Sequence, residues 1–147
     1  MKKIIISTLF SVVYVFCAAQ SESDIFGEWF NEEKDAVVTI YKDGNSISGK
    51  TTWLKEPLDS EGNAKLDLKN PDEKLRSRKR MGLKIMHSFK YNDQENNWED
   101  GRIYDPKKGK LYGGTATLVN KNELKLKGYI ISMPFLGRTA TWTRKTN

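Results

Sequence analysis

The chain of 147 residues has one cysteine, one histidine and four prolines. Cys17, the only cysteine, lies in an N-terminal segment that we expect to be removed, so the rest of the chain has neither a disulfide bond nor thiol chemistry. The single histidine has no second His or Cys to join it, and we therefore expect no metal site of the His/Cys type. The sequence also lacks a phosphate-binding loop and a nucleophile paired with a base, so no cofactor and no catalytic residue is predicted.

Long apolar runs are equally scarce, and the mean hydropathy of the chain is −0.66. The one run, residues 4–16, is too short to cross a bilayer as a stable helix. It follows Lys2 and Lys3 and precedes a small-residue cleavage site that ends at Ala19, which is the arrangement of an export signal. We therefore expect residues 1–19 to be a signal peptide and residues 20–147 to be one domain in the periplasm or outside the cell.

A lipoprotein anchored at Cys17 is the alternative reading of the same segment. The residue before a lipoprotein cysteine is normally Gly, Ala or Ser, whereas this chain has Phe16 there. The export signal without a lipid anchor is therefore the preferred interpretation.

Short runs of alternating apolar and polar residues, separated by Gly, Asn and Asp, predict an all-β fold. The expected strands span residues 25–31, 36–42, 46–55, 83–91, 98–104, 110–119, 123–131 and 136–144. Most connections between them are short enough for hairpins. Eight antiparallel strands in up-and-down order close into a barrel whose interior holds side chains or one small ligand.

The clearest local signal is the segment from Trp98 to Tyr112. Asp105 and Pro106 can open a turn, and Gly109 can adopt positive φ at its end. Aromatic-rich, roughly alternating runs lie on both sides of this turn. The segment therefore predicts a β-hairpin with large rings on its strands.

The connection over residues 56–81 is long for a domain of this size. Its second half has a helix start, with Asn70 as the N-cap, Pro71 at the first position and Glu73 three residues after the cap. We expect a helix of two turns over residues 71–78 that lies across one mouth of the barrel. Acidic residues from Asp59 to Asp67 suggest calcium ligands, but Gly62 is misplaced for an EF-hand loop, so no metal is predicted.

A basic run ends this predicted helix. It consists of Lys74, Arg76, Arg78, Lys79 and Arg80. A solvated helix face explains the run most simply, and attraction to an anionic membrane surface is the functional alternative. Nucleic acid is not an expected partner, because an exported protein rarely meets it.

Several polar side chains are predicted to share a face with apolar ones. Strict alternation places His87 on the inner face of its strand, and it places Arg102 and Tyr104 on the same face as Trp98. Arg138 shares a face with Trp142, so it is expected to pair with Asp100 or Asp105, to stack on Trp29, or to hold the anionic group of a ligand.

Five ordered motifs make the chain resemble a bacterial family known as domain of unknown function 2147. They are Gly27-x-Trp29, the segment 67–78, Gly82-Leu-Lys-Ile, the hairpin 98–112, and Leu136-Gly-Arg-Thr with Trp142-x-Arg144. The resemblance implies an exported, lipocalin-like β-barrel of bacterial envelopes with no established activity. It also implies that the first-strand indole closes the barrel floor under an arginine of the last strand. Met81 departs from the family pattern, at a position with no assigned role.

The combined prediction is a barrel that binds a small apolar or amphipathic, lipid-like molecule. The candidate ligand-binding residues are Trp29, Trp53, His87, Phe89, Trp98, Arg102, Tyr104, Tyr112, Arg138 and Trp142. Two alternatives stay open: a structural or interaction module with a filled barrel, and a hydrolase that uses carboxylates such as Asp100 and Asp105. A cavity of at least a few hundred Å³ separates the first reading from the second.

Overall fold

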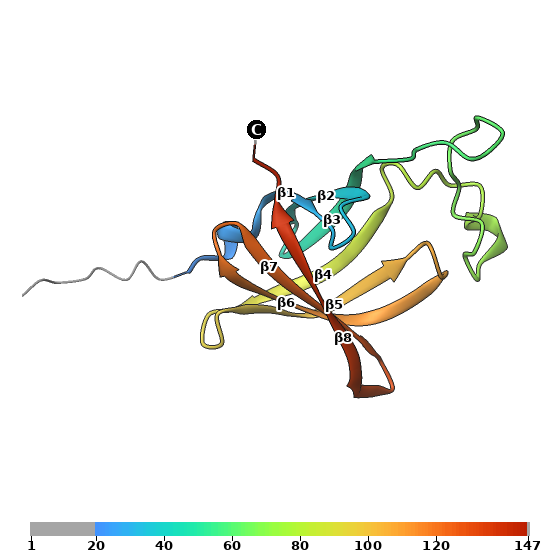
Figure 1. Cartoon of the computed structure of the whole chain (residues 1–147). Coiled ribbons are helices and arrows are strands. Elements are labelled where there is room, and N and C mark those ends of the chain that lie inside the picture. The colour runs from blue at the N-terminus through green and yellow to red at the C-terminus, as the bar shows by residue number, and fades with distance from the viewer. Residues whose placement is uncertain (1–19, 147) are drawn as a thin grey trace, which may run out of the picture.

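A computed structural model describes residues 20–146, so the predicted export signal over residues 1–19 lies outside the described residues. Eight antiparallel strands, each hydrogen-bonded to the next in sequence order, form a closed barrel (Figure 1). The strands are β1 (Gly27–Phe30), β2 (Ala36–Asp43), β3 (Ser46–Leu54), β4 (Lys84–Asn92), β5 (Asn97–Asp105), β6 (Lys110–Asn120), β7 (Glu123–Ile130) and β8 (Met133–Arg144). The predicted up-and-down barrel is confirmed. No helix within residues 20–146 has the length and apolar character needed to span a membrane.

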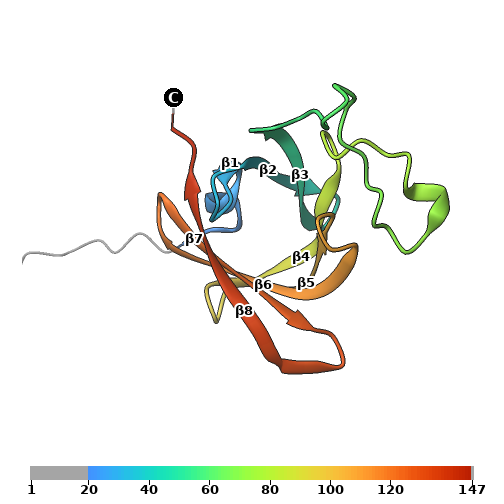
Figure 2. The same cartoon turned by 45° about the vertical axis from the view of Figure 1, so that its right-hand side comes forward.

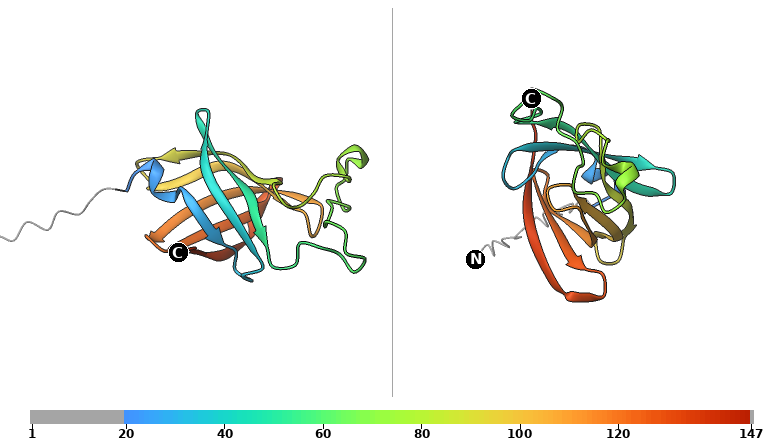
Figure 3. Two further views of the ribbon diagram at one scale, coloured as in Figure 1. Left: turned by 90° about the horizontal axis from the view of Figure 1, so that it is seen from above. Right: turned by 90° about the vertical axis from the view of Figure 1, so that its right-hand side faces the viewer.

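The up-and-down order gives the barrel two different ends. The β2–β3, β4–β5 and β6–β7 turns meet at one end, together with the 3-10 turn η1 (Glu22–Ile25), and we call this the closed end. The β1–β2, β3–β4, β5–β6 and β7–β8 connections meet at the other, which we call the open end. Figure 3 shows the barrel from two further directions.

An arginine of β8 seals the closed end over an indole of β1. The Arg144 guanidinium lies 4.1 Å from the centre of the Trp29 ring. It also donates hydrogen bonds to the carbonyl oxygens of Phe26 at 2.7 Å and Asp24 at 2.6 Å. The Trp29 indole is fully buried and donates to the Ile25 carbonyl at 2.8 Å. The floor implied by the lipocalin resemblance is therefore present, and Arg144 rather than Arg138 stacks on the indole.

Large side chains fill the closed half of the barrel. The buried core comprises Ile25, Trp29, Val38, Ile40, Ile47, Met86, Phe89, Trp98, Ala116, Leu124, Leu126 and Trp142. The Phe89 ring lies so close to Gly101 that a Cβ atom on this residue would be 2.5 Å from the ring. Glycine at position 101 is therefore a packing requirement of the core.

Two irregular residues change which side chains face the interior. Ser88 in β4 and Asp100 in β5 both have φ of 59°, and the β5–β6 register shifts between Trp98 and Gly101. An extra residue in a strand turns the following side chains to the opposite face. The strict alternation predicted for these two strands is therefore wrong: Met86 rather than His87 faces the core in β4, and Ile103 rather than Arg102 packs against it in β5.

The β3–β4 loop contains one 3-10 turn, η2 (Glu73–Leu75), in place of the predicted two-turn helix. Asp72 rather than Asn70 caps it, because its side chain accepts from the Lys74 amide. The Asn70 Oδ1 atom still accepts from the Asp72 amide, but its NH2 group donates to the buried Asp67. The backbone of Arg78 accepts a hydrogen bond from the Asp67 amide. These tertiary contacts compete with helix formation. Figure 2 shows the loop extending outward from the ends of β3 and β4.

We expect the Arg144→Lys substitution to lower the free energy of unfolding by about 2–4 kcal/mol, because lysine cannot reproduce the planar stacking and the divergent hydrogen bonds. Urea unfolding followed by intrinsic fluorescence measures the change. Arg138→Lys is the matched control on the same strand, with an expected change below about 0.5 kcal/mol. Equal effects of the two substitutions would contradict this account of the closed end.

Candidate functional site

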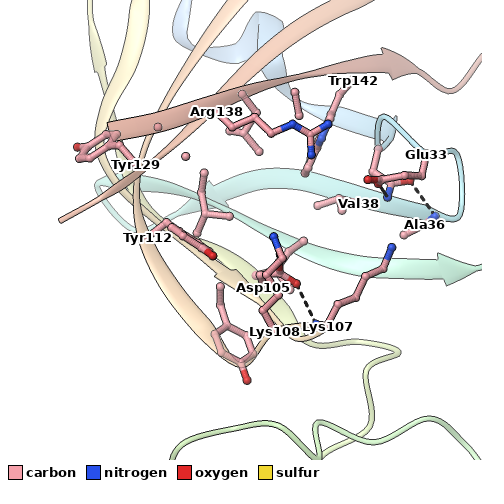
Figure 4. A pocket seen from close by; sticks show the side chains of 18 of the residues that line it. Glu33, Ala36, Val38, Asp105, Lys107, Lys108, Tyr112, Tyr129, Arg138 and Trp142 are labelled. Atoms are coloured by element: carbon pink, nitrogen blue, oxygen red, sulfur yellow. Dashed lines mark hydrogen bonds and ion pairs between the residues drawn. The ribbon is translucent and has the colours of Figure 1, made fainter. Parts of the chain in front are cut away.

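A cavity of about 530 Å³ occupies the open half of the barrel (Figure 4). Its lining comes from the β1–β2 loop and the adjoining residues of β2, from β4 and the β5–β6 hairpin, and from β7 and β8. The lining residues are Asn31, Glu33, Ala36, Val38, Ile85, Ile103, Tyr104, Asp105, Lys107, Lys108, Tyr112, Leu126, Gly128, Tyr129, Ile130, Leu136, Gly137, Arg138, Ala140 and Trp142. This volume lies in the range of small-molecule sites.

The cavity has an apolar wall and a charged rim. Val38, Ile103, Leu126 and the buried ring of Trp142 belong to the wall, and they continue the core from the closed half. The charges come mostly from turns and strand ends, and Arg138 comes from the middle of β8: Glu33, Asp105, Lys107, Lys108 and Arg138. An apolar interior with charges near the entrance suits an amphipathic molecule.

The barrel wall is incomplete between β1 and β8. β1 pairs with β8 only at Trp29–Arg144 and Phe30–Thr143, so residues 133–142 have no strand partner on that side among the described residues. The Glu32 carboxylate bridges part of this seam by accepting from the Arg138 guanidinium and from the Thr141 amide. The cavity is lined from both sides of the seam.

A second ion pair crosses the open end. The Lys107 ammonium in the β5–β6 turn lies 2.6 Å from the Asp35 carboxylate in the β1–β2 loop. Burial by itself would raise the pKa of Asp35, but hydrogen bonds from Lys107 and Asn31 outweigh it and hold the pKa below its ordinary value. Burial likewise opposes the charge of Lys107, yet its contact with Asp35 gives a net raised pKa. Both groups are therefore charged at neutral pH.

Four of the ten predicted ligand-binding residues line the cavity: Tyr104, Tyr112, Arg138 and Trp142. Trp29, Phe89 and Trp98 are fully buried in the closed half and are core residues instead. Trp53 is 41% exposed and packs edge-on against Phe30, with ring centres 6.0 Å apart. None of these last four contributes to the cavity.

The irregular residues in β4 and β5 explain why His87 and Arg102 do not line the cavity. Met86 and Phe89 both face the core, so His87 between them lies on the outer face, where burial and the nearby Lys84 lower its pKa. Arg102 pairs with His87 across the two strands and is exposed. Both residues were predicted to line the cavity, and both predictions are wrong.

The predicted pairing partners of Arg138 are also corrected. Its guanidinium contacts Glu32 and neither Asp100 nor Asp105. Asp100 lies 3.6 Å from Lys90 and does not line the cavity, whereas Asp105 lies at the rim, 3.7 Å from Lys108. The two carboxylates proposed for a hydrolase therefore do not face each other across the pocket.

Most of the cavity wall was missed by sequence reasoning. Leu126 and Ala140 alternate with polar neighbours as any barrel core residue does, so their pattern does not distinguish a wall from a filled interior. Strict alternation places Ile103 on the outer face, and the irregular Asp100 turns it inward. The charged residues of the β1–β2 loop, Glu32, Glu33 and Asp35, carry no motif. Their roles depend on which turn lies opposite, and this follows only from the closed barrel.

A buried carboxylate holds the long β3–β4 loop against the barrel. Asp67 is fully buried and accepts hydrogen bonds from the Tyr104 hydroxyl at 2.6 Å, from Asn70 at 2.8 Å and from Arg78 at 3.0 Å. Burial first, and then the contact with Asp67, raise the pKa of Tyr104 to about 12. The Tyr104 ring thus points from β5 to the loop, and its role is to anchor it.

The basic run in this loop is mostly engaged within the protein. Arg76 donates to the Asn70 carbonyl, Arg78 binds Asp67, and Arg80 donates to the carbonyls of Leu66 and Pro106. These contacts assign the three arginines to loop structure. No cluster of three potential metal ligands occurs in the described part of the chain, Asp59 to Asp67 included.

Comparison with known proteins gives a family and a fold. The sequence profile of a family described as "Uncharacterized protein conserved in bacteria (DUF2147)" matches residues 27–144. Among solved structures, the protein HP1028 of Helicobacter pylori, described as belonging to the lipocalin family, superposes with a TM-score of 0.63. It is 20% identical, and the match covers 76% of this chain and 73% of that protein. No protein with a curated description matches significantly.

Removal of the Tyr104 hydroxyl in Tyr104→Phe leaves the buried Asp67 with one hydrogen bond fewer. We expect the free energy of unfolding to fall by about 1–3 kcal/mol. Trypsin should also cleave faster between residues 65 and 80, and fragment masses identify the sites. Tyr41→Phe, on an exterior strand face, is the control and should change neither quantity. Unchanged loop cleavage in Tyr104→Phe would argue against the anchor.

Proposed function

The chain belongs to the bacterial family DUF2147, and from this membership and its hollow barrel we propose that it is an exported envelope protein that binds a small amphipathic molecule. The apolar part of the ligand lies in the cavity, and an anionic group lies at the rim beside Arg138. The observation that carries the proposal is the cavity of about 530 Å³ itself. A structural module with a filled barrel would instead be close-packed throughout its interior.

The charge arrangement supports an anionic group over a neutral one. Arg138 belongs to the cavity lining, and its side chain is 73% exposed although it pairs with Glu32. An exposed pair of this kind is weak, so a ligand carboxylate or phosphate can replace Glu32 at modest cost. The export signal predicted for residues 1–19 and the family membership support a location in the bacterial envelope.

The filled closed half of the barrel is the observation that favours the alternative, an interaction module. Phe89, Trp98 and Trp29 leave no space there, and the ligand site is confined to the open half. The hydrolase alternative has less support, because Asp100 lies outside the cavity.

A substitution that fills the cavity tests the ligand site directly. A Cβ atom added at Gly128 would meet Ile103 and Tyr112 at 3.9 Å, which is ordinary contact, and Gly128 lines the cavity. Gly128→Leu should therefore fold and occupy the space, and it should weaken the binding of cis-parinaric acid at least tenfold, about 1.4 kcal/mol. Fluorescence titration measures the binding.

Gly128→Ala is the matched control, since one methyl group leaves most of the cavity open. Its affinity should stay within about twofold of the wild type, a difference of at most about 0.4 kcal/mol. Absence of saturable binding to the wild-type protein, or equal binding by all three proteins, would contradict the proposal.

Two probes distinguish a charge-specific role of Arg138. In Arg138→Ala we expect the affinity for cis-parinaric acid to fall about three- to tenfold, because one partly exposed charge-assisted hydrogen bond is lost. The affinity for uncharged N-phenyl-1-naphthylamine should not change. Glu32→Gln, which removes the competing carboxylate, should strengthen binding of the acid. If Arg138→Ala loses affinity for both probes, the role of Arg138 is structural instead.

A further inference from the structure

The β7–β8 hairpin carries an exposed apolar tip at the open end. Its members, which we call the hairpin tip, are Ile130, Ile131, Met133, Phe135 and Leu136. Phe135 is 80% exposed, the highest value among the large apolar side chains that the structure describes as exposed. Figures 1 and 2 show this hairpin extending beyond the rest of the barrel, and the right panel of Figure 3 agrees.

The hairpin tip is continuous with the mouth of the cavity. Ile130 and Leu136 belong both to the tip and to the cavity lining. Ile130 and Ile131 also lie beside Leu111 of β6, which is 52% exposed. An uninterrupted apolar surface therefore runs from the outermost side chains into the barrel.

Four cations come from the elements next to this apolar surface. Lys110 and Lys127 come from the strands that flank the tip, Lys108 lies in the adjacent turn, and Arg138 follows on β8. Glu123 is the sole acidic residue from position 106 to position 138. At the cavity mouth, Asp105 pairs with Lys108 and Glu32 pairs with Arg138, so Lys110 and Lys127 are the cations left for lipid headgroups. Neither Lys110 nor Lys127 forms an ion pair within residues 20–146.

We propose that the hairpin tip inserts into the surface of an anionic lipid bilayer, with the flanking cations on the lipid headgroups and the cavity mouth facing the membrane. Apolar side chains ringed by Lys and Arg are the composition that binds such an interface. The tip is the end of one two-stranded hairpin, and free cations lie beside it, so its charge favours an anionic bilayer over a protein partner.

This surface differs from the basic run of the β3–β4 loop, where Arg76, Arg78 and Arg80 bind groups of the loop and of the adjacent turn. It also goes beyond the proposed function, since membrane contact is measurable with no ligand in the cavity. If the protein does not bind vesicles, the cavity proposal still stands. If the cavity binds no ligand, the membrane proposal still stands.

Vesicle flotation tests the proposal. Every variant is made in the full-length chain, so that the N-terminal residues contribute equally to the binding of all of them. The wild-type protein should float with vesicles of phosphatidylethanolamine and phosphatidylglycerol, more weakly with phosphatidylcholine alone, and less as salt is raised. Ile131→Ser with Phe135→Ser should lower binding about tenfold through lost apolar insertion. Both side chains are exposed, so thermal unfolding should be unaffected.

Two controls separate the hairpin tip from other surfaces. Val119→Ser removes an exposed apolar side chain at the closed end and should leave binding unchanged. Lys74→Gln with Lys79→Gln neutralises the lysines of the loop run and should also have little effect. A larger loss from the loop lysines than from the tip residues would overturn the proposal.

A reporter at the tip measures insertion itself. The tryptophan in Phe135→Trp should be quenched by brominated lipids beyond the quenching of the wild-type protein. Binding without additional quenching would overturn the proposal, as would no vesicle binding by the wild-type protein. Sedimentation that shows a dimer dissociated by the tip substitutions, with no change in vesicle binding, would assign the tip to a second copy instead.

Discussion

The stacking of Arg144 on Trp29 joins the last strand to the first, and the rest of the barrel depends on this contact. β1 has four residues and pairs with β8 at two positions, so its backbone alone provides little closure. The guanidinium adds hydrogen bonds to two carbonyl groups that precede β1. One end of the barrel is therefore rigidly sealed, while the seam toward the other end depends on side chains.

The division into a filled half and a hollow half follows from the sizes of the inward-facing residues. Phe89, Trp98 and Trp29 fill the closed half, and Gly101 makes room for the Phe89 ring. Toward the open end the inward positions include Gly128 and Ala140, which leave space between them. Rings at one end and small side chains at the other thus produce a pocket without enlarging the barrel.

The strands could be predicted from the sequence, because period-two alternation and turn residues are local properties. The Asp105–Gly109 turn is an example, since Gly109 adopts the expected positive φ of 67°. The positive φ of Ser88 and Asp100 has no such local signal, and each reverses the faces of the residues around it. For this reason His87 and Arg102 were placed in the interior. The Glu32–Arg138 and Lys107–Asp35 pairs join loops that become neighbours only in the closed barrel, so sequence spacing does not reveal them.

The seam also bears on how the protein avoids aggregation. A strand with unpaired amide and carbonyl groups is a template for another strand, and closed barrels normally leave none. Here residues 133–142 of β8 form such an edge. Pro134 lacks an amide donor near the hairpin, and Glu32 accepts from the Thr141 amide at the other end, so the edge is interrupted at both ends. The gap beside the cavity is thus interrupted at both ends, by one proline and one carboxylate, which opposes strand addition by a second molecule.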